Sequence, residues 1–204
     1  MKAILISIQP QWVELILNLI KKDEIRKGTA LYKAINKLIE QQGVAPMLIY
    51  CTKKYDECLW YKKDSQRYVL NYGKPTNDYL NGKVVARFNA TADLLELKMI
   101  EGGLYFTTPD RDCFTPNLDL NENAQIDNWQ LLHYAGTKLG TQITDIHINA
   151  LVIFDEPKEI SEFRQWRDCG KCWHEEDCDC NLETCFMTGG KLTRAPQSYC
   201  YVEV

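Results

Sequence analysis

Residues 3–27 read AILISIQPQWVELILNLIKKDEIRK, and this stretch contains the signals that fix the start of the fold. The apolar run Ala3–Ile8 is typical of a buried strand, and Pro10 stands where a helix favours its first residue. Apolar side chains then recur on a broad face for about three helical turns. The short stretch Asp23–Lys27 has the character of a strand. We therefore expect a strand, a helix and a second strand at the beginning of the chain.

The same local signals extend along the rest of the chain. Thr29 is a suitable N-cap and Gly43 a suitable end for a helix over Ala30–Gln42, and a short helix is expected over Asp127–Ala135. Further strands are expected over Met47–Thr52, Cys58–Tyr61, Arg67–Leu70, Lys83–Ala90, Ile143–Phe154 (in one or two pieces) and Tyr199–Val204, the first three of these as a meander. Strands outnumber helices and regular crossovers are missing, which predicts an α+β fold, a small mixed β-barrel with flanking helices.

Length, composition and charge indicate a globular domain and exclude several classes of protein. The chain has 204 residues, of which 45% are hydrophobic, and this is enough for one well-filled domain. No stretch approaches the ~18 apolar residues of a membrane span, and the apolar opening stops at Gln9 and Pro10, so we expect no membrane contact and a cytoplasmic location. Residues 1–100 carry a net charge of +6 and residues 101–204 a net charge of −10. This asymmetry excludes a uniformly basic nucleic-acid coat but allows a local basic face.

Lys21, Glu24 and Arg26 form the strongest candidate binding site. In an extended strand, residues 24 and 26 point to the same face, and Lys21 can approach from the preceding turn. Arg26 and Lys21 could then hold a phosphate or a base edge while Glu24 accepts from an exocyclic amine. Lys21 and Glu24 are also the candidate catalytic pair. The alternative is a surface cluster of charges, which stabilises a protein by only ~0–1 kcal/mol per pair.

Two weaker candidates lie elsewhere. Tyr50 and Lys53 belong to a region in which aromatic and basic residues alternate, as in grooves that stack single-stranded bases. Ordinary strand aromatics with a solvated opposite face explain the same pattern. His147 lies in an expected strand, where a histidine is more often a satisfied core residue than a catalyst.

A cysteine cluster near the C-terminus predicts a metal site. Cys169 and Cys172 have the C-x2-C spacing that lets two thiolates converge on one tetrahedral ion. Two further ligands are available among Cys178, Cys180 and Cys185; we prefer Cys180 and Cys185, with Cys178 or His174 as alternates. Four thiolates leave no open coordination position, so the expected zinc ion is structural. Free thiols in an acidic loop are the alternative.

Several motifs together resemble a known family. They are Ile4–Ile8, Pro10, Trp12, Ile16–Asn18, Lys21, Glu24–Lys27, Ile49–Lys53, Asn81–Val85, Ala135-Gly136, His147-Ile148, Phe154-Asp155, Pro157–Phe163 and Arg194–Glu203. In this order they resemble ASCH-domain proteins of the PUA-like superfamily, in particular a longer subgroup common in phages and prophages of Gram-positive bacteria. Leu19 replaces the family's loop glycine, and Glu24 stands where the small bacterial members have Thr.

The resemblance implies a small β-barrel that binds RNA or a modified nucleobase. Small bacterial members of the family hydrolyse the amide of acetylated cytidine, so amide hydrolysis on a modified nucleoside is the first alternative. A phage-encoded protein that inhibits a host defence protein through its acidic half, in the bacterial host cytoplasm, is the second. We expect residues 1–166 to form the barrel domain with insertions, residues 167–190 the zinc-binding loop, and residues 191–204 a strand that returns to the barrel.

Overall fold

The structure of the chain is a computed structural model that describes residues 1–73, 79–100, 103–108, 118–166 and 188–204. The chain divides into two compact units. Unit 1 contains Met1–Val13, Pro46–Arg87 and Val152–Val204, and unit 2 contains Glu14–Ala45 and Phe88–Leu151. Each unit is therefore built from segments that are distant in the sequence.

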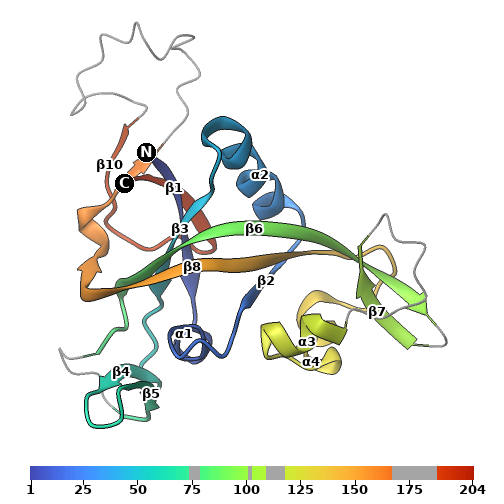
Figure 1. Cartoon of the computed structure of the whole chain (residues 1–204), viewed down its shortest axis with the longest axis horizontal. Coiled ribbons are helices and arrows are strands. Elements are labelled where there is room, and N and C mark those ends of the chain that lie inside the picture. The colour runs from blue at the N-terminus through green and yellow to red at the C-terminus, as the bar shows by residue number, and fades with distance from the viewer. Residues whose placement is uncertain (74–78, 101–102, 109–117, 167–187) are drawn as a thin grey trace, which may run out of the picture. The chain divides into compact units, whose positions relative to one another are not determined.

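The α+β class is confirmed, with more strands than helices (Figure 1). The elements of the described residues are, in chain order, β1 (Lys2–Ile8), α1 (Pro10–Leu17), β2 (Asp23–Lys27), α2 (Ala30–Gln42), β3 (Pro46–Cys51), β4 (Cys58–Lys62), β5 (Arg67–Asn71), β6 (Lys83–Ile100), β7 (Gly103–Thr107), α3 (Leu118–Ala124), α4 (Asn128–Ala135), β8 (Gln142–Glu159), the 3-10 helix η1 (Ile160–Glu162), β9 (Arg164–Trp166), β10 (Thr188–Lys191) and β11 (Tyr199–Glu203). None of the helices among these is long and apolar enough to cross a membrane.

The main sheet has the strand order β10-β9-β11-β1-β3-β6-β8-β2, and β7 pairs with β6. Strands β1 and β3 are parallel, whereas β1 and β11 are antiparallel, so the sheet is mixed. Its end strands β10 and β2 each have one neighbour in the described part of the chain. The sheet formed by the described strands is thus open and not closed into a barrel.

Unit 1 is centred on β1, whose seven residues are all buried. Leu5 packs with Leu48, Phe163 and Val202 in one apolar cluster. The predicted meander is wrong in one respect, because β3 pairs with β1 while β4 and β5 form a separate two-stranded sheet. Every β3 residue after Pro46 is buried, whereas β4 and β5 are partly exposed. The apolar β3 therefore takes a central place that a meander edge would not give it.

Unit 2 contains the parts of β6 and β8 on which the helices pack. Leu95 and Ile143 of these strands pack against Leu120 of α3 and Leu131 of α4, together with Ile25 of β2. Figure 1 shows α2 on the opposite side of β6 and β8 from α3 and α4. The first three residues of β2 are buried.

The helix predictions succeed where local signals are strong. Helix α2 has the predicted bounds and ends at Gly43, whose φ of 77° is the left-handed conformation that glycine favours, although Thr29 makes no side-chain cap. Helix α4 is capped by Asp127, which forms a capping box with Gln130. Helix α1 is shorter than the expected three turns, since it ends at Leu17 and Leu19 has a φ of 61°.

Candidate functional site

Strand β2 brings two groups of charged residues together within unit 2. It pairs with β8 in antiparallel register, with Asp23 opposite His147 and Ile25 opposite Asp145. Because side chains alternate along a strand, Asp23, Asp145 and His147 share one face of this pair. Glu24 and Arg26 project from the other face. We call Lys21, Glu24 and Arg26 the basic network, and Asp23, Asp93, Asp145 and His147 the acidic cluster.

The basic network is a chain of ion pairs centred on Glu24. Its Oε1 lies 3.1 Å from Arg26 Nη2, and its Oε2 lies 3.6 Å from Lys21 Nζ. The Lys21 ammonium also donates to the carbonyl of Ala124 at the end of α3. Burial lowers the pKa of Lys21, and the neighbouring Glu24 carboxylate opposes that shift. The predicted convergence of these three side chains is therefore present.

The basic network lies inside the protein and is not a surface cluster. Lys21 is 5% exposed and Glu24 is 6% exposed. The Arg26 side chain is the accessible member, at 17%. Ion pairs at this depth are costly to desolvate and are destabilising to break, so the alternative of a weak surface cluster does not describe them.

An aromatic residue that sequence reasoning missed lies next to the basic network. The Lys27 ammonium lies 4.8 Å from the ring centroid of Tyr134, which is exposed on α4. Burial raises the pKa of Tyr134, while the charge of Arg26 lowers it and that of Glu24 raises it. Tyr134 thus presents a partly exposed ring beside the Lys27 ammonium. No local signal indicated it, because α4 is more than 100 residues away from β2 in the chain.

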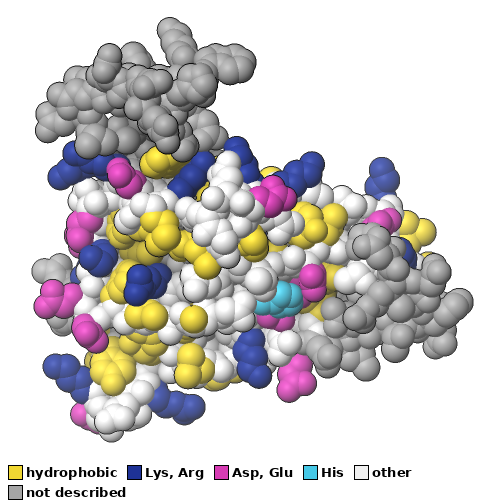
Figure 2. Space-filling model, turned by 45° about the horizontal axis from the view of Figure 1, so that its top comes forward, with side chains coloured by type: hydrophobic (Ala, Val, Ile, Leu, Met, Phe, Trp, Pro, Cys, Tyr) yellow, Lys and Arg dark blue, Asp and Glu magenta, His cyan; other side chains and the backbone are white. Residues whose placement is uncertain are grey.

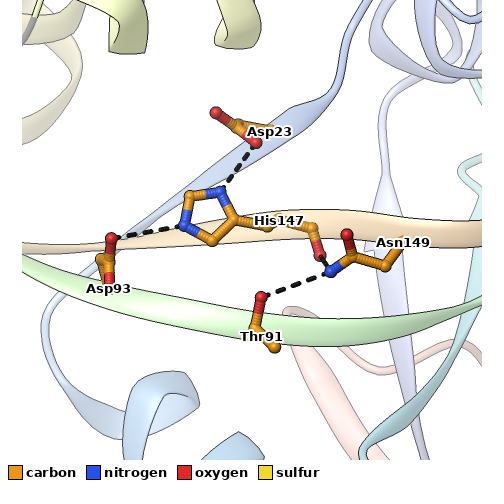
Figure 3. A network of polar contacts seen from close by, with 5 residues as sticks. All are labelled: Asp23, Thr91, Asp93, His147 and Asn149. Carbon is orange, nitrogen blue, oxygen red and sulfur yellow. Dashed lines mark hydrogen bonds and ion pairs between the residues drawn. The ribbon is translucent and has the colours of Figure 1, made fainter.

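The acidic cluster is organised around His147. Its Nδ1 lies 2.9 Å from Asp23 Oδ1 and its Nε2 lies 3.4 Å from Asp93 Oδ2, so each ring nitrogen faces a carboxylate from a different strand (Figure 3). The hydrogen bond to Asp23 is the main cause that raises the pKa of His147 to about 9. In addition, Asn149 donates to Thr91, which ties β8 to β6 beside the histidine.

Asp145 is the most deeply buried member of the acidic cluster. It is 2% exposed, and its Oδ1 has no hydrogen-bond partner among the residues that the structure describes. Burial, followed by the charge of Asp23, raises its pKa to about 7. Buried carboxylates with a strongly shifted pKa occur often at functional sites, which makes Asp145 a candidate site residue. Sequence reasoning selected His147 but missed Asp23, Asp93 and Asp145. Asp145 and His147 are two residues apart, which predicts that they share one face of a strand. No local signal shows that β2 pairs with this strand and adds Asp23 to the cluster.

The other predicted binding residues belong to unit 1. Tyr50 is buried in the apolar cluster around Leu5, and burial raises its pKa. The aliphatic part of Lys53 lies against Gly82. The structure therefore places Lys21, Glu24, Arg26 and His147 in unit 2, with His147 on the opposite face of the β2–β8 pair from Glu24 and Arg26, whereas Tyr50 and Lys53 are parts of a separate unit.

The predicted zinc ligands lie outside the described residues. These are Cys169, Cys172, Cys180 and Cys185, with Cys178 and His174 as alternates. Among the cysteines that the structure describes, Cys51, Cys58 and Cys200 are free thiols.

Comparison with protein-family models, with curated proteins and with solved structures gives no match. The function is therefore inferred from the site itself. Acidic and basic side chains are interspersed over the molecular face in Figure 2, which agrees with the exclusion of a uniformly basic coat. The informative features are local, namely the basic network and the acidic cluster.

Proposed function

We propose that the protein is a PUA-like, ASCH-related module that binds RNA or a nucleobase at the accessible end of the basic network. The observation that supports this most directly is the position of Arg26, which is partly exposed and braced by Glu24, on the strand whose next residue, Lys27, lies over the exposed ring of Tyr134. The PUA-like classification rests on the sequence resemblance, whose motifs include Lys21, Glu24 and Arg26.

The chemistry of this arrangement suits a planar, anionic ligand. Glu24 holds one nitrogen of the Arg26 guanidinium, and a guanidinium oriented in this way can present its remaining donors to a phosphate or a base edge. Tyr134 offers a ring for stacking, which is worth ~1–3 kcal/mol per base. Lys27 adds a second cation next to that ring. In this proposal, Lys21 and Glu24 act as an internal brace that orients Arg26.

Binding of labelled single-stranded RNA and of cytidine nucleosides, measured by fluorescence anisotropy and by competition, tests the proposal. Arg26→Ala and Tyr134→Ala should each weaken binding about tenfold, in line with the loss of one charged or stacking contact. The matched control is Lys33→Ala, which removes an exposed cation on α2. Wild-type affinity in both Arg26→Ala and Tyr134→Ala would refute the proposed site.

A second candidate function is hydrolysis of the amide of a modified nucleoside. The observation that favours it is the Lys21–Glu24 pair, an amine and a carboxylate 3.6 Å apart and nearly excluded from water. In such a hydrolysis, Glu24 would take a proton from the attacking water and Lys21 would give one to the leaving amine, so that the C–N bond breaks as the C–O bond to water forms. Incubation with acetylated cytidine, followed by chromatography for cytidine and acetate, tests this function. Turnover that Lys21→Met abolishes would support it, and absence of any product would exclude it for this substrate.

A further inference from the structure

We propose that the acidic cluster binds one divalent metal ion of the Mn²⁺ type, with Asp23, Asp145 and His147 as ligands and Asp93 as the partner that orients the histidine. This site is distinct from the basic network, because its ligands project from the opposite face of the β2–β8 pair. It requires neither of the two functions proposed above.

The geometry of the ligand atoms fits one ion. One carboxylate oxygen from each aspartate and one ring nitrogen of His147 all lie within 4.8 Å of one another. Ligands at a typical bond length of ~2.1 Å lie up to roughly 4.2 Å apart across an ion. Small side-chain rotations therefore bring the three atoms into coordination. Two of the ligands lie on β8 and one on β2, which is a rigid support for a metal site.

Asp145 provides an independent indication of a missing partner. Buried carboxylate oxygens are nearly always hydrogen-bonded, and each exception calls for an explanation. Within the described part of the chain, Asp145 Oδ1 has no hydrogen-bond partner, although its residue is 2% exposed. The carboxylate also lies within reach of a second buried carboxylate, that of Asp23. A bound cation would satisfy the oxygen and neutralise both groups.

The surroundings of His147 match those of a metal-binding histidine. Such a histidine usually donates its second ring N–H to a carboxylate, which fixes the tautomer and the orientation of the ring. Nε2 of His147 already faces Asp93, at 3.4 Å, and Nδ1 faces the Asp23 ligand (Figure 3). A metal ion on Nδ1 would leave the contact with Asp93 in place.

The ligand set and its exposure indicate the kind of ion. Two carboxylates and one imidazole are hard or borderline donors that suit Mn²⁺ and similar ions, whereas thiolates select zinc. Lys21 is the nearby competing cation, but its ammonium is engaged by Glu24 and by the Ala124 carbonyl. The His147 side chain is 34% exposed and that of Asp93 60%, so an ion can enter from the surface. Three protein ligands leave coordination positions for water.

Mn²⁺ binding to the full chain, measured by electron paramagnetic resonance after removal of metals with a chelator, tests the proposal. Mn²⁺ is chosen because the cysteine-rich segment should prefer zinc. One saturable site is expected. Asp145→Asn and His147→Gln should each weaken it at least tenfold, and Asp93→Asn should weaken it ~10–100-fold through the histidine. The control His133→Gln alters the exposed histidine of α4 and should bind as the wild type does.

A thermal shift distinguishes loss of the site from loss of the fold. Mn²⁺ should raise the Tm of the wild type but leave the Tm of Asp145→Asn unchanged. If Asp145→Asn does not fold, the same thermal shift is measured on His147→Gln. This variant should fold, because His147 is only partly buried. Arg26→Ala should bind Mn²⁺ normally, which separates this site from the nucleobase site. Absence of saturable Mn²⁺ binding to the wild type, or wild-type affinity in the folded ligand variants, would overturn the proposal.

Discussion

Strand β2 contributes residues to both the basic network and the acidic cluster, but the buried charges of the two groups are paired differently. In the basic network, Lys21 and Arg26 flank one carboxylate, and each oxygen of Glu24 has a cationic partner. In the acidic cluster, three carboxylates surround a single histidine, and one oxygen of Asp145 has no hydrogen-bond partner in the described ranges of the chain. Adjacent residues of β2 therefore belong to one group whose buried carboxylate, Glu24, is paired at both oxygens and to another in which a buried carboxylate oxygen is not paired; we call these the satisfied and the unsatisfied group. The comparison shows that the balance of partners, more than burial, separates a structural brace from a candidate ligand site.

The largest effect is expected when the satisfied group is broken. Glu24→Gln leaves Lys21 and Arg26 without their shared anion, and loss of one partner from a buried ion pair costs about 3 kcal/mol of the free energy of unfolding. Urea denaturation measures this. The matched control is Lys158→Gln, which breaks an exposed pair with Glu162 and should cost ~0–1 kcal/mol. Equal small effects in the two variants would show that the basic network is not a buried brace.

The opposite sign is expected when the unsatisfied group is neutralised. Asp145→Asn removes a buried charge next to Asp23 and breaks no hydrogen bond at Oδ1. In the presence of a chelator at pH 8, the free energy of unfolding should therefore rise by about 1 kcal/mol. A decrease of similar size would mean that the carboxylate stabilises the metal-free protein, and the contrast between the two groups would fail.

A change in the salt dependence of RNA binding would sharpen the role of Arg26. If its guanidinium contacts a phosphate, Arg26→Ala should reduce the slope of log K against log salt by about 1. Tyr134→Ala should weaken binding without changing that slope, because stacking displaces no counterions. Fluorescence anisotropy across a salt series measures both. Identical slopes in the wild type and Arg26→Ala would mean that Arg26 contacts a base or no ligand at all.

The smallest expected effect concerns the titration of Tyr134. Burial raises its pKa above the ordinary value of 10.0, with Glu24 also raising it and Arg26 lowering it. The stability that the neutral phenol contributes is fully present below pH 10 and is lost as the pH rises through the higher folded pKa. Tyr134→Phe should thus lose less stability at alkaline pH than the wild type. Phenolate absorbance, taken as wild type minus variant, should show that this phenol ionises at a higher pH than a free tyrosine. An ordinary pKa would show that the Tyr134 hydroxyl is not buried.

Local signals predicted much of the fold, and pairing between distant segments explains most of the errors. The bounds of α2 follow from apolar periodicity and from Gly43, both of which act within a few residues. The neighbour of β3 depends on β1, and no signal in Met47–Thr52 encodes that choice. For the same reason, an open sheet could not be distinguished from a closed barrel.

The candidate site residues also fall into those that local spacing predicts and those that depend on pairing between distant strands. Glu24 and Arg26 are two residues apart, so strand alternation alone predicts that they share a face. Asp23 and His147 are 124 residues apart and meet only because β2 pairs with β8 in one register. Sequence patterns therefore could not predict that the residues of the acidic cluster lie close together, because this depends on how β2 pairs with β8.

Strand β2 lies at the edge of the sheet, so one change in the length of the preceding turn could exchange the charged side chains on its two faces. Deletion of one residue from the turn before Asp23, if it shifted the strand by one position along β8, would invert every side chain. Glu24 would then enter the place of Asp23, and the arginine would face the carboxylates. Length changes in this turn should consequently be tolerated far less than substitutions, and libraries that vary its length would map the constraint directly.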